Sequence, residues 1–208
     1  MDKLKTYGDI YDKDFLEKFG EYRKDVEKTE LEKEFEVDVD KIADLCEIHV
    51  SYKDLDVDID QDEIGACKMM HSVPKTKFKD YDTIIELREI TINKARTEEV
   101  KRFILAHEIG HIMIGNLKIP ENVKKNDSNK NLVQRLNELN SAFFANELLL
   151  PEVLIIKSLE KIMKDLNYDS KQNFSENDIK LFTEKTANLM KVPRELLKLR
   201  IDRLNVFS

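Results

Sequence analysis

The stretch His107-Glu108-Ile109-Gly110-His111 decides how the rest of the chain is interpreted. It has the form H-E-x-x-H and lies inside a segment with helical periodicity. Residues four apart on a helix lie one turn apart on the same face, so the two imidazoles can bind one metal ion. Glu108 follows the first ligand directly, where its carboxylate can take a proton from a water at the metal. The motif therefore predicts a metal-dependent hydrolase with Glu108 as its general base.

The helix around this motif is predicted to begin after Thr97, because a capping residue is followed there by two acidic residues. Gly115 and Asn116 are the predicted stop signals. Burying two histidines and a glutamate without partners costs free energy, which favours a metal site over histidines that only fill a core. Gly110 costs about 1 kcal/mol relative to alanine inside a helix, so it indicates a close approach to the backbone. One stripe at three- and four-residue steps contains Val100, Phe103, Ile104, His107, His111 and Ile114.

A catalytic zinc needs a third protein ligand and keeps a fourth position for water. No third histidine follows the motif, which leaves a downstream carboxylate. Glu121 and Asp127 lie in the polar stretch 120–131, which is predicted to be a loop and would hold a ligand poorly. The remaining candidates are Glu138 and Glu147, both within a predicted helix over 132–150.

Two stripes run along the predicted helix 132–150. A stripe of small side chains would let this helix pack closely against the motif helix, with Glu138 directed toward the metal. Glu147 lies nearer the other, bulky stripe, so spacing favours Glu138 while the other acids remain open. The bulky stripe contains Leu132, Leu136, Leu139 and Phe143, and the small one contains Glu138, Ser141, Ala142, Ala145 and Leu149.

Both segments resemble the ImmA/IrrE family of metallopeptidases. Residues 101–111 are similar to the family signature R-R-F-t-l-A-H-E-l-G-H, and residues 138–151 to E-x-x-A-N-x-F-A-x-x-L-L-m-P. Ser141 and Ala142 depart from the second pattern, since the family usually has Ala-Asn there. The resemblance runs from about Asp38 to the C-terminus. It implies a Zn²⁺ ion held by His107, His111 and Glu138, with Glu108 as the catalytic residue.

The resemblance also implies a function. Members of the family cleave helix-turn-helix repressors of prophages, mobile elements or stress regulons in the cytoplasm, which predicts a zinc-dependent endopeptidase with such a repressor as its substrate. Two alternatives remain: a zinc-fold module that binds a repressor without cleaving it, and a toxin or effector peptidase with another cytoplasmic target. The presence of Glu108 favours a peptidase, because a purely structural site needs no general base. The group that stabilises the oxyanion is not identified, although Tyr168 and His71 are candidates.

The composition restricts the possible partners. The chain has 35 Lys and Arg against 42 Asp and Glu, and its net charge of −7 argues against nucleic-acid binding over its whole surface. No apolar run approaches about 18 residues and no apolar signal region begins the sequence, so we expect a cytoplasmic protein without membrane contact. Cys46 and Cys67 are expected to be small buried hydrophobes and not a disulfide.

The expected fold is α+β of zincin type. A small twisted sheet from roughly 48 to 93 should pack beside the motif helix, followed by a helical C-terminal half. Residues 1–36 are predicted to form an N-terminal helical extension with a helix at 12–28, and residues 37–208 the metallopeptidase domain. Asp40 is the predicted cap of a short helix. Extended segments are predicted at 48–52, 54–60, 64–70 and 83–93, and C-terminal helices at 152–166, 176–191 and 194–204.

Overall fold

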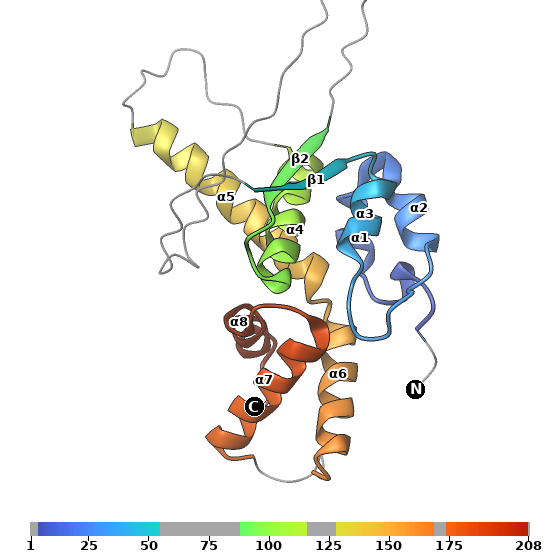
Figure 1. Ribbon diagram of the computed structural model, residues 1–208, viewed down its shortest axis with the longest axis vertical. Helices are drawn as coiled ribbons and strands as arrows, with labels where there is room; N and C mark the ends of the chain where they lie inside the picture. The colour runs from blue at the N-terminus through green and yellow to red at the C-terminus, as the bar shows by residue number, and fades with distance from the viewer. Residues whose placement is uncertain (1–3, 55–87, 116–127, 169–173, 208) are drawn as a thin grey trace, which may run out of the picture.

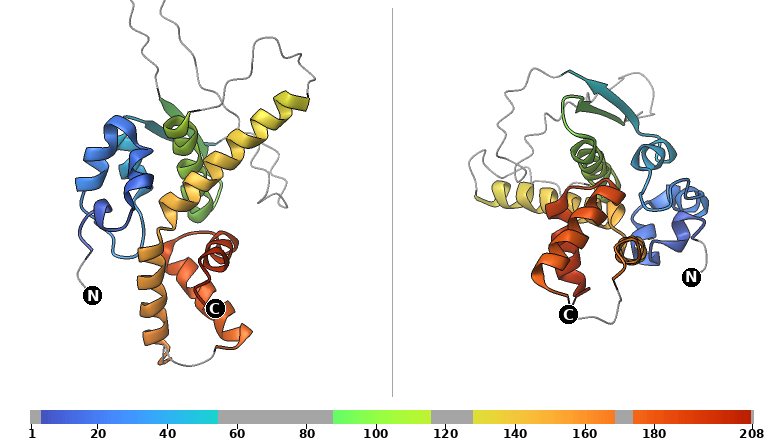
Figure 2. Two further views of the ribbon diagram at one scale, coloured as in Figure 1. Left: turned by 180° about the vertical axis from the view of Figure 1, so that it is seen from behind. Right: turned by 60° about the horizontal axis from the view of Figure 1, so that its bottom comes forward.

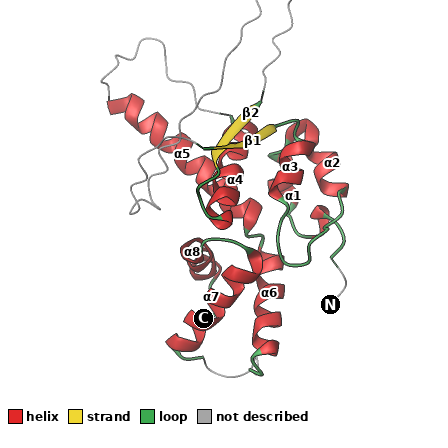
Figure 3. Cartoon of the chain, in the orientation of Figure 1, coloured by secondary structure: helices red, strands yellow, loops and turns green. Residues whose placement is uncertain are grey.

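The computed structural model describes residues 4–54, 88–115, 128–168 and 174–207. The fold is α+β and mostly helical, with one two-stranded parallel sheet among these residues (Figures 1 and 3). The helices are η1 (Tyr7–Asp9), α1 (Lys13–Glu17), η2 (Gly20–Tyr22), α2 (Arg23–Lys28), α3 (Val39–Leu45), α4 (Glu98–Ile114), α5 (Ser128–Leu149), α6 (Glu152–Asp165), α7 (Glu176–Met190) and α8 (Arg194–Leu204). The strands are β1 (His49–Lys53) and β2 (Glu89–Asn93).

Helix α4 lies near the centre of the arrangement, as Figures 1 and 2 show. It crosses α5, and this is the most extensive contact between helices among the described residues. The sheet lies at one end of α4, α1 to α3 lie at its side, and α6 to α8 form a separate layer below. One continuous hydrophobic core joins these parts. The motif helix is therefore supported from several directions.

Two strands of the sheet expected from the sequence lie among the described residues. β1 and β2 run parallel, with Val50 opposite Ile90 and Tyr52 opposite Ile92. Ile90 and Ile92 are buried, and β2 contacts α4. The strand predicted at 48–52 and the end of the one at 83–93 are confirmed. The segments predicted at 54–60, apart from its first residue, and at 64–70 lie outside the described residues.

The single helix predicted at 12–28 is wrong, because the chain breaks between α1 and α2. Gly20 has φ +57°, a left-handed conformation that no α-helix interior accepts and that glycine adopts without a steric penalty. The break lets Phe15, Phe19 and Val26 all turn into the core, where each is buried. Burial therefore outweighed the local periodicity. The N-terminal segment (residues 4–36) shares one hydrophobic core with the rest of the described chain. The domain boundary expected after residue 36 therefore stays a prediction.

The cap predicted for the short helix is also displaced. Asp38, and not Asp40, caps α3, and its Oδ1 accepts a hydrogen bond from the Lys41 backbone N–H at 3.1 Å. Asp40 lies in the first turn and accepts a hydrogen bond from the Tyr52 hydroxyl at 2.7 Å. Both acids suit a helix N-terminus, so the sequence alone did not separate them.

The remaining helices follow the predicted pattern closely. α4 begins directly after Thr97 and ends before Gly115, which has φ +74°. α6, α7 and α8 match the three predicted C-terminal helices to within about a residue at each end. α5 begins earlier than expected, so residues 128–131, predicted as loop, are helical. The rest of that loop, 120–127, lies outside the described residues.

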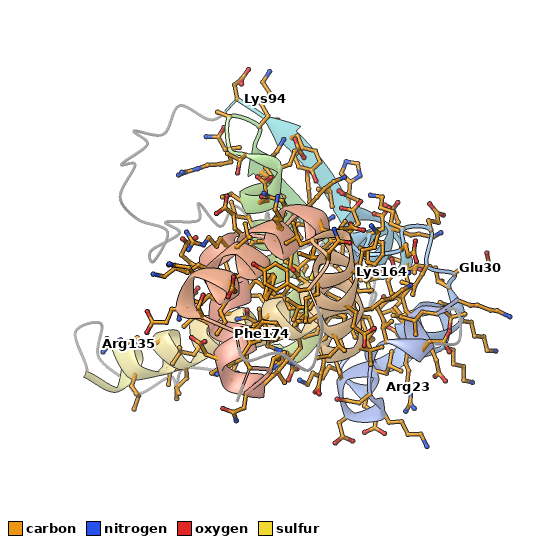
Figure 4. All side chains as sticks on the ribbon, turned by 90° about the horizontal axis from the view of Figure 1, so that it is seen from below. Arg23, Glu30, Lys94, Arg135, Lys164 and Phe174 are labelled. Atoms are coloured by element: carbon orange, nitrogen blue, oxygen red, sulfur yellow. The ribbon has the colours of Figure 1, made fainter. Side chains whose placement is uncertain are left out.

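The bulky stripe of α5 faces solvent rather than the core. Leu132, Leu136, Leu139 and Phe143 are all exposed. The start of α5, which carries Arg135, extends from the body (Figure 4). The stripe of small residues makes the contact with α4 instead. Within the described ranges, no single helix has the length and hydrophobicity of a membrane span, although α5 and α6 together pass that test as a bent pair.

Cys46 is a free thiol buried in the core. Burial raises its pKa to about 12, so the thiol stays neutral near neutral pH, and only the thiolate reacts quickly with alkylating reagents. In a Cys67→Ala variant, iodoacetamide at about pH 8 should leave the native protein unlabelled and should label it in concentrated urea. Mass spectrometry measures both reactions. Labelling of the native protein at the rate of the unfolded chain would contradict the burial of Cys46.

Candidate metal centre

The centre is built where α4 and α5 touch most closely. A Cβ placed on Gly110 would lie 3.0 Å from the Ser141 carbonyl oxygen and 3.1 Å from the Phe144 Cβ. Only glycine fits there without movement of α5. Ser141 and Ala145 are buried in the same contact. The close approach predicted from Gly110 and from the small residues of α5 is thus observed.

The two motif histidines face one carboxylate across this contact. His107 and His111 lie one turn apart on α4, with 3.1 Å between their Nε2 atoms. Glu138, from α5, has its Oε2 3.2 Å from the His107 Nε2 and its Oε1 3.6 Å from the His111 Nε2. Among the described residues, these three form the group of His, Cys, Asp or Glu side chains with the spacing of a metal site.

The spacing of these atoms is compatible with one divalent ion. With ligand distances of about 2.0–2.1 Å, two ligands of a tetrahedral zinc lie about 3.3 Å apart. The observed separations of 3.1, 3.2 and 3.6 Å lie around that value. Two imidazole nitrogens and one carboxylate are also a known donor set of catalytic sites, which leave a fourth position open. The residues present therefore fit a catalytic type of metal site.

The exposure of the three side chains differs. The His107 and His111 side chains are 7% and 8% exposed, whereas that of Glu138 is 52% exposed. The cluster is therefore buried on the side of α4 and exposed to solvent on the side of α5. Glu108 follows His107 on α4 and is partly exposed. The cluster is therefore accessible to solvent at Glu138.

The other candidates have different surroundings. Glu147 forms an ion pair with Lys18 of the N-terminal segment and is not part of the cluster. The Tyr168 hydroxyl donates to the Asp178 Oδ1 at 2.7 Å, within an aromatic group between α6 and α7. Its pairing there gives no support to an oxyanion role. Glu121, Asp127 and His71 lie outside the described residues.

Sequence reasoning missed the anchor of the motif helix. Arg102, almost buried, donates from Nε to the Lys191 carbonyl at 3.0 Å and from Nη2 to the Val37 carbonyl at 2.9 Å. Its Nη1 lies 3.8 Å from the carboxylate of Glu36, which is also buried. Arg102 thus ties α4 to the segment before α3 and to the turn between α7 and α8. These partners are distant in sequence, so no local pattern indicates them.

Replacing Arg102 with Met should lower the free energy of unfolding by about 3 kcal/mol, because it leaves the Val37 and Lys191 carbonyls without their donors. It also removes one of the cations around the buried Glu36 carboxylate, which keeps Lys33 and Lys191. Urea unfolding followed by circular dichroism measures this change. Arg194→Met, at an exposed position of α8, is the control and should change stability by less than about 0.5 kcal/mol. Equal changes in the free energy of unfolding would show that the buried contacts of Arg102 stabilise the fold no more than an exposed arginine does.

The comparisons with known proteins agree with this geometry. The model of the M78 peptidase family, described as the IrrE N-terminal-like domain, matches residues 65–202 and so covers more than half of the chain. Neither the curated proteins nor the solved structures give a match. The family match includes the motif helix α4 and helix α5, which carry all three members of the cluster. The chain therefore belongs to the ImmA/IrrE family of metallopeptidases.

Proposed function

We propose that the protein is a zinc-dependent endopeptidase that cleaves a protein substrate at a specific site. The observation that carries the proposal is the convergence of His107, His111 and Glu138 from two helices, with Glu108 next to the first of them. A site that served only to stabilise the fold would be enclosed on all sides. Here the Glu138 side chain is half exposed, so a polypeptide could approach the cluster from that side.

The chain's own residues account for the chemistry as follows. His107, His111 and Glu138 would hold the ion, which when bound acidifies a water and polarises the scissile carbonyl. The Glu108 carboxylate takes the proton from the attacking water and passes it to the nitrogen of the leaving amine. Glu108 directly follows His107 on α4, so the helix that carries two of the proposed ligands also carries the base.

We also propose a zincin-type arrangement, in which the substrate binds as an extended strand beside the sheet. β2 packs against α4, so a polypeptide added to this sheet would run past the motif helix. Backbone hydrogen bonds give such a complex its affinity, and they keep the substrate backbone extended around the scissile bond. This placement requires the substrate to be unfolded or extended at the cleavage site.

The proposed substrate is a helix-turn-helix repressor of a prophage, mobile element or stress regulon, in the cytoplasm. The support for it is membership of the ImmA/IrrE family, together with an acidic chain that has no expected nucleic-acid contact of its own. The repressor encoded beside the gene of this protein is the first substrate to test.

The experiment incubates the purified full chain with that repressor and zinc, with and without a chelator, and identifies the products by mass spectrometry. A single cut that the chelator abolishes and added zinc restores would support the proposal. A stable complex without any cut would instead support the binding module. If the experiment gave no cut and no complex, this substrate would be rejected, and an effector peptidase with another target would be favoured.

A further inference from the structure

We infer that Phe15 and Phe19 of the N-terminal segment are positioning residues for the metal centre, acting through Phe144 of α5. The inference rests on the proposed metal site. Neither phenylalanine belongs to the residues that match the family, which begin at residue 65. Their side chains nevertheless lie in the same core as the motif helix.

The rings of Phe15, Phe19 and Phe144 contact one another. The Phe144 ring centroid lies 5.1 Å from that of Phe15 and 5.5 Å from that of Phe19. Phe15 and Phe19 meet edge to face at 5.5 Å, and all three side chains are buried. These separations are those of favourable aromatic pairs. The N-terminal rings therefore fill the space beside Phe144 and fix its rotamer.

Phe144 also contacts the backbone of α4 at Gly110. Its Cβ is 3.1 Å from the position that a Cβ on Gly110 would occupy, so nothing separates this residue from the α4 backbone. Gly110 directly precedes His111. Phe144 is thus held between the N-terminal rings and the backbone that carries the histidines. Protein interiors are packed as densely as crystals, so a vacancy at Phe15 would let Phe144 and α5 shift.

Helix α5 connects this contact to the proposed ligand. Glu138 lies on α5, fewer than two turns before Phe144. Metal–ligand distances tolerate only about 0.2 Å of error. A small movement of α5 away from Gly110 therefore moves the Glu138 carboxylate out of reach of an ion held by the histidines.

One polar contact ties the same segment to the end of α5. The Tyr11 hydroxyl donates to the Leu148 carbonyl at 2.5 Å, one of the last carbonyls of α5, which have no partner within the helix. Burial raises the pKa of Tyr11, so this hydroxyl remains a donor. Figure 2 shows the N-terminal helices beside this end of α5.

The test compares two buried aromatic groups. Phe15→Leu disturbs the rings around Phe144, whereas Phe182→Leu disturbs the separate group of Phe174, Phe182 and Tyr168 near α7. Figure 4 shows Phe174 well away from Arg23 of the N-terminal segment. For each variant of the full chain, the zinc dissociation constant is measured by competition with a chromophoric chelator, and stability is measured by urea unfolding without metal. Tyr11→Phe, which removes only one hydroxyl, serves as the mild variant.

Phe15→Leu is expected to weaken zinc binding about tenfold, the size of effect seen when groups that orient metal ligands are removed. Phe182→Leu should lose comparable stability and bind zinc as the unsubstituted chain does. Equal zinc affinities of the two variants would overturn the inference. If Phe15→Leu does not fold, Tyr11→Phe decides, and unchanged zinc affinity in that variant would also overturn it. If the unsubstituted chain binds no zinc, the proposed metal centre fails, and the inference with it.

Discussion

Replacing Glu108 with Gln is expected to abolish cleavage of the substrate while the protein still binds its metal. The amide has nearly the shape of the carboxylate, so α4 should keep its structure and the three members of the cluster should keep their positions. It cannot accept the proton from the attacking water. General acid–base catalysis contributes typically 10²–10⁴-fold, and a loss of at least about 10²-fold in rate is expected.

Three measurements on the Glu108→Gln variant check this expectation: the rate of repressor cleavage, the metal content by atomic absorption, and the unfolding midpoint. Glu99→Gln is the matched control, since Glu99 lies on the same helix in its acidic first turn. It should leave the cleavage rate within about twofold, because it removes no more than a small helix-dipole interaction. A Glu108→Gln variant that cleaved at the normal rate would transfer the role of base to another group.

The parts of the fold that local signals specify were predictable. α4 begins after Thr97 as predicted, although the Thr97 side chain makes no capping hydrogen bond, and it ends before Gly115. The selection of Glu138 among several acids came from the small residues on its helix, and the structure places its carboxylate within 3.6 Å of both histidines. Helical spacing and side-chain volume are properties of short segments, so they can be read directly from the chain.

What escaped prediction depends on contacts between distant segments. The break at Gly20 directly follows Phe15 and Phe19, which contact Phe144 more than a hundred residues away. Arg102 donates hydrogen bonds to the carbonyls of Val37 and Lys191, and no sequence pattern near residue 102 indicates these partners. The exposure of the bulky stripe of α5 could not be predicted either, because the helical period shows that Leu132 and Leu136 share a face but not whether another element covers it.

Replacing Glu138 with Ala should remove the metal from the protein under conditions in which the unsubstituted chain is fully loaded. The variant would leave two imidazoles as the only protein ligands at a site that needs three. Loss of a group that merely orients a ligand already costs 10–100-fold in affinity, so loss of the ligand itself should cost more than about 100-fold. Cleavage should fall in parallel, and excess zinc should restore it only in part.

The matched control is Glu147→Ala, on the same helix and also partly exposed, but paired with Lys18 and outside the cluster. Both variants remove one carboxylate from α5, so they share any general effect of charge on metal binding. Because the Glu138 side chain is half exposed, its loss creates little cavity, and the variant without metal should unfold within about 1 kcal/mol of the unsubstituted chain without metal. Stoichiometric zinc in Glu138→Ala, or loss of zinc in Glu147→Ala, would assign the third ligand to a different residue. If both variants kept their zinc, the histidines would have a partner beyond the carboxylates of this helix.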